Sequence, residues 1–266
     1  MTSSELSPFD FYPGSLPLLV SFPHAGTFVP QDLHAAMSKE AAGLPDTDWH
    51  LDRLYDFVHE RGSHVIRANY SRYVVDLNRP PDDAPLYTGA TTGLMPEVQF
   101  DGTPIFAHEP APDRSAYLDS VWRPYHDKIR STLEALRAEH GYAILFDAHS
   151  IRSVIPRLFE GQLPDFNIGT HESRSLDADL EARLCDVCAS QPPYTSVLNG
   201  RFKGGYTTRH YGEPARNIHA VQLELSQRTY MEEQPPFAYR EDLAAQVQPA
   251  LQAFVETLID WQPAQK

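Results

Sequence analysis

Residues 142–150 read YAILFDAHS, a short apolar run followed at once by polar groups. The run from Tyr142 to Phe146 is typical of a buried strand. Asp147 and His149 come directly after it. In open α/β sheets, ligands bind beyond the carboxyl ends of the strands. The stretch therefore predicts a central strand that delivers ionisable side chains to a functional edge.

Strands and helices are expected to alternate on both sides of this stretch. Apolar runs predict further strands at residues 16–22, 64–68, 73–77 and 218–225. Apolar residues at helical spacing predict helices at residues 48–61, 114–140, 175–189 and about 240–260. We expect Pro124 to kink or restart the second helix and Gly141 to end it. This order predicts a three-layer α/β fold, a mixed, mostly parallel sheet flanked by helices.

Length and charge narrow the classes of function. The 266 residues are 41% hydrophobic, enough for one core, so we expect a single domain over 1–266 with a flexible N-terminus at 1–14. With 22 Lys and Arg against 36 Asp and Glu, the net charge is −14. Such a chain is not attracted to nucleic acid or to anionic membranes. We therefore expect neither as a partner, and the oligomeric state is not predicted.

The sequence also indicates the compartment. We find no run of about 18 uncharged apolar residues that would span a membrane, and no basic and apolar N-terminal segment typical of a secretory signal. The two cysteines, Cys185 and Cys188, cannot form a disulfide framework, and they fall late in a helical pattern. We expect a reduced, cytoplasmic protein in which both cysteines serve packing.

Polar residues at the strand ends suggest a metal site. His24 follows the first predicted strand, and His149 follows the central one. Two imidazoles plus a carboxylate, with a fourth position open, form the ligand set of catalytic zinc. The third ligand is expected between residues 46 and 52, which hold several acidic groups. Asp48 is preferred because it lies at the start of a predicted helix, and His50 is the alternative.

Other groups at the same edge suggest the chemistry. Glu224 lies on an otherwise apolar strand, where burial would raise its pKa toward neutrality, and beside a metal it would act as a general base. Asp147 is either a strand-end cap or a carboxylate that orients a metal ligand. Arg79 follows Asn78 and precedes two prolines, so its guanidinium is rigidly mounted and suited to a carboxylate or an oxyanion.

Two long loops are expected, and loops of this length in compact domains are often functional. Residues 78–113 are rich in proline, and residues 199–214 read NGRFKGGYTTRHYGEP. The second loop contains Arg201, Lys203 and Arg209. Either these side chains are simply solvated, or they form a positive patch that receives an anionic substrate.

Six short motifs, in this order, resemble the N-formylglutamate amidohydrolase family over about residues 15–260. They are SFPHAG (21–26), DTDWH (46–50), SRYVVDLNRP (71–80), DAHS (147–150), GGYT (204–207) and QLEL (222–225). The resemblance implies His24, Asp48 and His149 as metal ligands and Glu224 as general base. It implies that Asn78 and Arg79 hold the substrate and polarise its carbonyl. It also implies a fold like that of the zinc carboxypeptidases and aspartoacylases.

One departure concerns the second ligand. The zinc carboxypeptidases have a glutamate three residues after the first histidine, where this chain has Thr27. The resemblance to the formylglutamate group places Asp48 there instead. Zinc is the expected ion, although sites of nitrogen and oxygen ligands also accept Mn, Fe or Co.

The implied activity is hydrolysis of N-formyl-L-glutamate to formate and L-glutamate, the last step of one route of histidine breakdown. Zinc would activate a water molecule, which Glu224 deprotonates before it protonates the departing amine. Arg79 would help to hold the oxyanion. The expected substrate-binding residues are Asn78, Arg79, Lys203, Gly205, Tyr206 and Arg209. The alternatives are a deacylase of N-formyl- or N-acetylaspartate, and a non-catalytic binder of dicarboxylates.

Overall fold

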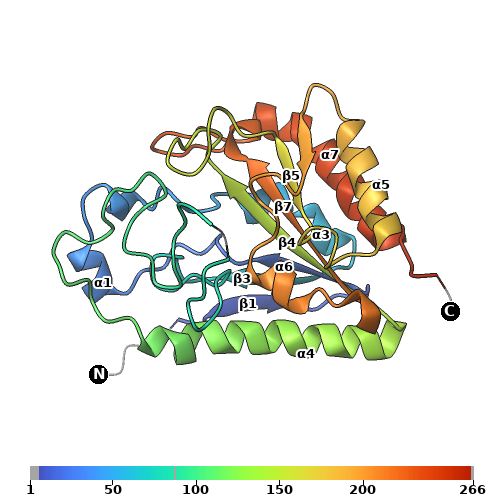
Figure 1. Ribbon diagram of the computed structural model, residues 1–266, viewed down its shortest axis with the longest axis horizontal. Helices are drawn as coiled ribbons and strands as arrows, with labels where there is room; N and C mark the ends of the chain where they lie inside the picture. Colours follow the sequence, from blue (N-terminus) through green and yellow to red (C-terminus); the bar gives the residue numbers. More distant parts are fainter. Residues whose placement is uncertain (1–5, 87, 265–266) are drawn as a thin grey trace.

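The computed structural model describes residues 6–86 and 88–264, and in this part of the chain seven strands form one sheet (Figure 1). In spatial order they are β1 (Phe9–Tyr12), β3 (His64–Ala68), β2 (Leu18–Phe22), β4 (Ala143–Ile151), β7 (Ile218–Ser226), β5 (Phe166–Gly169) and β6 (Ser196–Leu198). Only the β1–β3 and β5–β7 pairs of this sheet are antiparallel. The prediction of a mixed, mostly parallel sheet is confirmed.

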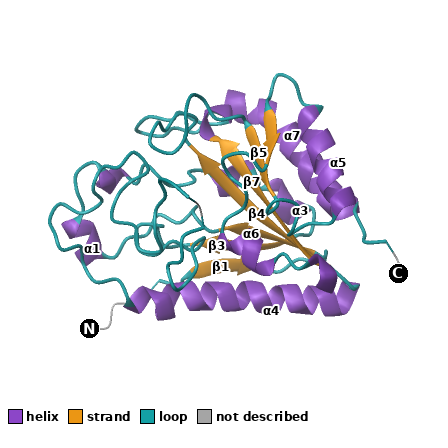
Figure 2. Cartoon of the chain, viewed as in Figure 1, coloured by secondary structure: helices purple, strands orange, loops and turns teal. Residues whose placement is uncertain are grey.

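Helices cover both faces of the sheet. The longer ones are α4 (Arg123–His140), α5 (Ala178–Ala189) and α7 (Glu241–Asp260), and the shorter ones are α1 (Gln31–Ala36), α2 (Leu51–Leu54), α3 (Phe57–Glu60) and α6 (Tyr206–Tyr211). Single turns lie at η1 (Ala41–Gly43), η2 (Leu118–Trp122), η3 (Pro214–Arg216) and η4 (Gln227–Thr229). Figure 1 shows α4 along one face, with α5 and α7 on the other. Figure 2 shows the long loops gathered on the side away from α5 and α7.

The alternation of side chains along each strand builds two cores. On β2, Val20 packs into the core shared with α5 and α7, whereas Leu19 packs into the core shared with α4. Helix α4 starts as expected, because Pro124 stands in its first turn behind the π-type turn η2. It ends at Gly141, whose φ of 84° is unfavourable for other residues.

Some elements differ from the sequence-based expectation. Residues 73–77 are buried but form turns, because the amide of Val74 bonds to Ser71 and the amide of Asp76 bonds to Leu94. The helix expected over 48–61 is split into α2 and α3. Residues 9–12, assigned to a flexible N-terminus, form β1, while residues 1–5 of that segment lie outside the described residues. Strands β5 and β6 and helices α1 and α6 were not predicted.

Among the described residues, no helix has both the length and the apolar composition that a bilayer crossing requires.

Candidate active site

Strands β4 and β7 change from apolar to polar along one face as they approach their carboxyl ends. The early positions pack into the core under α4, and they are Ala143, Leu145, Ile218 and Ala220. The next side chains on that face are paired across the strands, Asp147 with Gln222 and His149 with Glu224. All four are buried. The sheet therefore holds ionisable groups at fixed positions in a site with little water.

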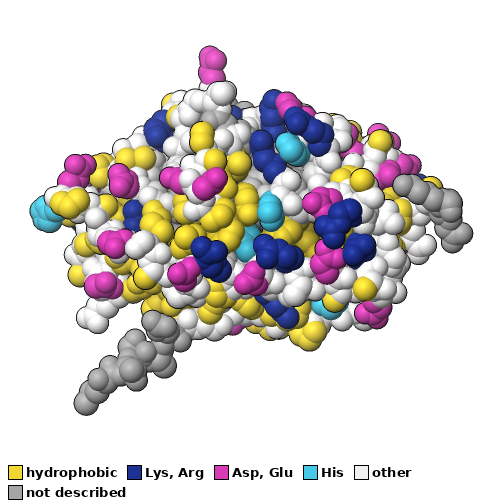
Figure 3. Space-filling model, turned by 60° about the horizontal axis from the view of Figure 1, so that its bottom comes forward, with side chains coloured by type: hydrophobic (Ala, Val, Ile, Leu, Met, Phe, Trp, Pro, Cys, Tyr) yellow, Lys and Arg dark blue, Asp and Glu magenta, His cyan; other side chains and the backbone are white. Residues whose placement is uncertain are grey.

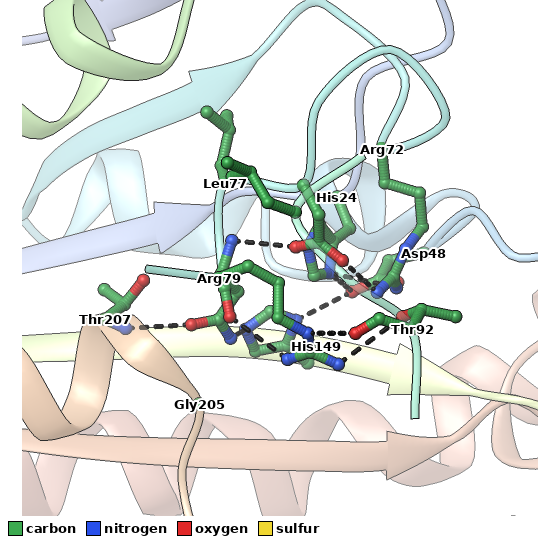
Figure 4. Close-up of polar contacts among 12 residues, drawn as sticks. His24, Asp48, Arg72, Leu77, Arg79, Thr92, His149, Gly205 and Thr207 are labelled. Atoms are coloured by element: carbon green, nitrogen blue, oxygen red, sulfur yellow. Dashed lines mark hydrogen bonds and ion pairs between the residues drawn. The ribbon is translucent and has the colours of Figure 1, made fainter. Parts of the chain in front are cut away.

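The structure brings His24, Asp48 and His149 together (Figure 4). Each offers one ligand atom, and these atoms all lie within 4.8 Å of one another. Asp48 Oδ2 is 3.9 Å from His24 Nδ1 and 3.1 Å from His149 Nδ1. The backbone supports this arrangement, since the amide of Asp48 bonds to the carbonyl of His24 and the amide of Ser150 donates to Asp48 Oδ2.

Each histidine has a carboxylate behind it. His24 Nε2 lies 2.8 Å from Asp76 Oδ1, and His149 Nε2 lies 2.9 Å from Asp147 Oδ2. Such carboxylates fix the protonated nitrogen of a metal-binding histidine and leave the other nitrogen for the ion. Both Nδ1 atoms face Asp48. Two buried nitrogens and one carboxylate oxygen, each with this support, fit a divalent cation of the zinc type.

Electrostatics supports the same assignment. Burial opposes the ionisation of Asp76, but Arg72 and His24 hold its pKa well below the usual range. Burial lowers the pKa of His24, and the Arg72 guanidinium lowers it further. Burial also opposes protonation of His149, but Asp147 and Asp48 raise its pKa well above the usual value. The close approach of Asp48 to His149 thus calls for a positive charge between them, either a proton or a metal ion.

Arg72 is a buried site residue for which the sequence analysis proposed no role. Its Nη2 donates to Asp76 Oδ2 at 2.6 Å, its Nη1 lies 3.2 Å from His24 Nδ1, and its guanidinium lies over the ring of Phe100 at 4.5 Å. The signal that could have found it was its place in the SRYVVDLNRP motif, four residues before Asp76.

Glu224 has the environment of a general base. Burial raises its pKa to about 7, and the charge of His149 works in the opposite direction. Gln222 Nε2 donates to Glu224 Oε2 at 3.1 Å, while Gln222 Oε1 accepts from the amide of Gly205 at 2.7 Å. Because both ends of the Gln222 amide have partners, its donor points at the carboxylate.

A cavity opens in front of these groups. Its lining includes both histidines, Glu224 and three arginines, and the full set is His24, Arg72, Asn78, Arg79, Thr91, Thr92, Phe100, His149, Ile151, Leu158, Arg201, Phe202, Gly205, Gln222 and Glu224. Figure 3 shows one face of the molecule, on which Lys and Arg side chains are interspersed with Asp and Glu side chains, in a chain whose net charge is −14. A cavity with three arginines suits an anionic ligand.

Several expected binding residues lie elsewhere. Lys203 pairs with Glu172 at 2.8 Å, and Arg209 Nε donates to the carbonyl of Gly204 at 2.8 Å; neither lines the cavity. The ring of Tyr206 packs near Trp122 and His126 in the aromatic cluster beside α4, outside the cavity lining.

The alternative ligand His50 also lies outside the group, since its Nε2 is 2.7 Å from the carbonyl oxygen of Phe237. Asn78 lines the cavity, but its amide is used within the protein. Its Oδ1 accepts from the amide of Thr207 at 2.8 Å, and its Nδ2 is 2.9 Å from His149 Nε2 and 3.2 Å from Asp147 Oδ2.

Comparison with known proteins identifies the family. The model of the N-formylglutamate amidohydrolase family matches residues 16–231. The chain is 55% identical over 254 residues to the N-formylglutamate deformylase of Pseudomonas putida, which covers 94% of this chain and 95% of the relative. The deformylase of Pseudomonas aeruginosa is also 55% identical, covering 94% and 96%.

A solved structure supports the fold. The crystal structure of N-formylglutamate amidohydrolase from Ralstonia eutropha JMP134 matches with a TM-score of 0.81 at 24% identity, over 95% of this chain and 98% of that one. Sequence match and shared architecture extend over nearly the whole polypeptide. The chain belongs to the N-formylglutamate amidohydrolase family.

Proposed function

We propose that this protein hydrolyses N-formyl-L-glutamate to formate and L-glutamate. The observation that carries the proposal is the convergence of His24, His149 and Glu224 on one cavity, with Asp48 between the two histidines. The family and the names of the two Pseudomonas relatives supply the substrate. The arginines of the lining suit its two carboxylates.

The metal ligands in this proposal are His24, Asp48 and His149, and zinc is the preferred ion, with Mn, Fe or Co as alternatives. When bound, a divalent ion supplies Lewis-acid polarisation of the formyl oxygen and a lowered pKa for water. Asp76 and Asp147 hold the histidines in the tautomer that presents Nδ1.

Glu224 performs the proton transfers. Its carboxylate accepts the proton of the attacking water and then donates a proton to the amine nitrogen that leaves the formyl carbon. A pKa near 7 suits both steps, because the group must be both a base and an acid at neutral pH. Gln222 orients Oε2 of this carboxylate. Arg79 lies on the cavity wall, where a guanidinium serves a substrate carboxylate or the oxyanion.

The test is formate release by the purified protein. We expect release from N-formyl-L-glutamate and much slower release from N-formyl-L-aspartate and N-acetyl-L-aspartate. Faster turnover of an aspartate derivative would favour a deacylase of another N-acyl amino acid. No release from any of the three by the zinc-loaded protein would favour a dicarboxylate binder.

Three further properties belong to the same proposal. The mixed sheet with its site at the strand ends supports the finer assignment to a zinc-carboxypeptidase-like architecture. The cysteines Cys185 and Cys188 are free thiols, which supports a cytoplasmic location. The small-molecule substrate requires no nucleic-acid or membrane partner, and a single catalytic domain suffices for the activity.

A further inference from the structure

Two arginines of the cavity are held by one short segment of the proline-rich loop. Arg79 Nε donates to the carbonyl of Thr92 at 2.7 Å, and Arg201 Nη2 donates to the carbonyl of Ala90 at 2.9 Å. Arg201 Nε also donates to the carbonyl of Leu158 at 2.7 Å. These three backbone acceptors hold the two guanidinium groups in place at the cavity wall.

The two arginines occupy different parts of the cavity wall. Arg79 lines the same cavity as His149 and Glu224, and it follows Asn78, whose side-chain nitrogen lies 2.9 Å from His149 Nε2. Arg201 comes from the loop between β6 and α6, and Leu158 anchors it from a third segment. The third arginine of the lining, Arg72, belongs to the metal-ligand group, because its Nη2 pairs with Asp76, which supports His24.

Two anchored arginines on one cavity suit a dicarboxylate, because each guanidinium can hold one carboxylate. The two carboxylates of glutamate are separated by three carbon atoms, and those of aspartate by two. Two arginines that are held in place and that grip both carboxylates of the longer molecule would therefore grip the shorter one less well.

We propose that Arg201 binds the side-chain carboxylate of the substrate while Arg79 binds the α-carboxylate, and that this pair selects N-formylglutamate over N-formylaspartate. The inference rests on the proposed deformylase activity and adds the residue that sets its selectivity. Arg201 takes the role that the sequence suggested for Lys203 and Arg209, both of which lie outside the cavity lining.

The experiment compares two substrates on one protein sample. N-formyl-L-glutamine has the shape of N-formyl-L-glutamate but carries no charge on its side chain. In Arg201→Met we expect kcat/KM for N-formyl-L-glutamate to fall about 10- to 100-fold, the loss of a charge-assisted hydrogen bond, and kcat/KM for N-formyl-L-glutamine to change less than about threefold. The ratio of the two kcat/KM values does not depend on the fraction of the protein that folds.

The matched control is Lys203→Met, which removes a positive charge from the same loop but outside the cavity. In this variant the ratio of kcat/KM for N-formyl-L-glutamate to that for N-formyl-L-glutamine should equal the wild-type ratio. Arg201→Met should also narrow the preference for N-formyl-L-glutamate over N-formyl-L-aspartate. A parallel fall for both the glutamate and the glutamine substrate, or an unchanged ratio in an active enzyme, would overturn the role of Arg201. A wild type that releases no formate would instead refute the deformylase activity itself.

Discussion

Gln222 donates a hydrogen bond to Glu224 from two residues away on the same strand, with 3.1 Å between Nε2 and Oε2. The amide of Gly205 fixes the other end of the Gln222 side chain at 2.7 Å. A loop, a strand and the proposed general base, Glu224, are thereby linked through one amide group.

Gln222→Met keeps the length of the side chain but removes both hydrogen bonds. We expect kcat to fall about 10- to 100-fold, because the carboxylate of Glu224 loses its orienting donor, while KM and bound zinc stay near wild-type values. Steady-state kinetics and metal analysis on the same preparation measure all three. A rise in KM at unchanged kcat would show that Gln222 serves binding and not the orientation of the base.

Glu224→Gln should leave the fold and the metal content intact and reduce kcat by about 10²- to 10⁴-fold, because the amide cannot accept the proton of water. Stability should hold or rise, since burial works against the charged carboxylate that the variant removes. Formate release and thermal unfolding provide the two measurements. Turnover within a factor of about two of the wild type would remove Glu224 from the proton-transfer role.

Asp48→Asn should lower zinc occupancy sharply, because a neutral amide is a poor substitute for the carboxylate between the two imidazoles. Metal analysis after dialysis measures it. His34→Ala is the control, since His34 is exposed on α1 and lies outside the candidate group. Full zinc occupancy in Asp48→Asn would refute this residue as a ligand.

Gly205→Ala should impair both stability and activity. A Cβ at this position would lie 2.3 Å from Nδ2 of Asn78, and Asn78 in turn contacts His149. We expect a loss of about 1–3 kcal/mol in unfolding free energy and a lower kcat. Gly43→Ala is the matched control, because nothing lies within 4 Å of its Cβ position. Equal unfolding midpoints for the two variants would contradict the crowding at Gly205.

The buried ring of His126 should make the free energy of unfolding depend on pH. It is buried on α4, its Nε2 lies 2.9 Å from the carbonyl of Leu77, and burial lowers its pKa from 6.5 to about 3. Above pH 6.5 the His126 ring is neutral in both the folded and the unfolded state, so the ring does not oppose folding and stability is at its full value. As the pH falls from 6.5 toward 3, the unfolded chain takes up a proton and the folded chain does not, which removes up to about 1.4 kcal/mol per pH unit.

The measurement is urea unfolding of the wild type and of His126→Gln at pH 7, 6 and 5. Other titrating groups are common to both proteins and cancel in the difference. The wild type should lose more stability than the variant between pH 6 and 5. Parallel pH profiles would show that His126 is not held neutral in the folded state.

The sequence was most informative where apolar periodicity was long. The helix over about 240–260 was predicted nearly to the residue, because helical spacing over about five turns is a strong signal, and the short apolar run at 64–68 was also placed correctly. Strand β6, with three residues, carries no such signal. The strand predicted at residues 73–77 was wrong for a different reason, because a buried apolar run can form turns as well as a strand.

Some residues of the candidate site could be predicted from the sequence, and others could not. His24 follows β2, and His149 lies in β4, which continues to Ile151 instead of ending near Phe146 as the sequence predicted. The two strands are parallel neighbours, so the convergence of the two histidines at one edge follows from the topology of the sheet. Whether a loop arginine faces the cavity depends instead on backbone carbonyls far away in sequence. Arg201 is drawn in by Ala90 and Leu158, whereas Lys203, two residues later, turns to Glu172. No local pattern distinguishes these two outcomes.

The length of β4 and β7 has an evolutionary consequence. Each has nine residues, and their mutual pairing continues to the last of them, so the proposed base Glu224 and the proposed metal ligand His149 lie on a ladder of backbone hydrogen bonds. Arg79 and Arg201 lie in loops instead. Mutations in those loops can retune which acyl amino acid is accepted while the reaction chemistry is inherited unaltered.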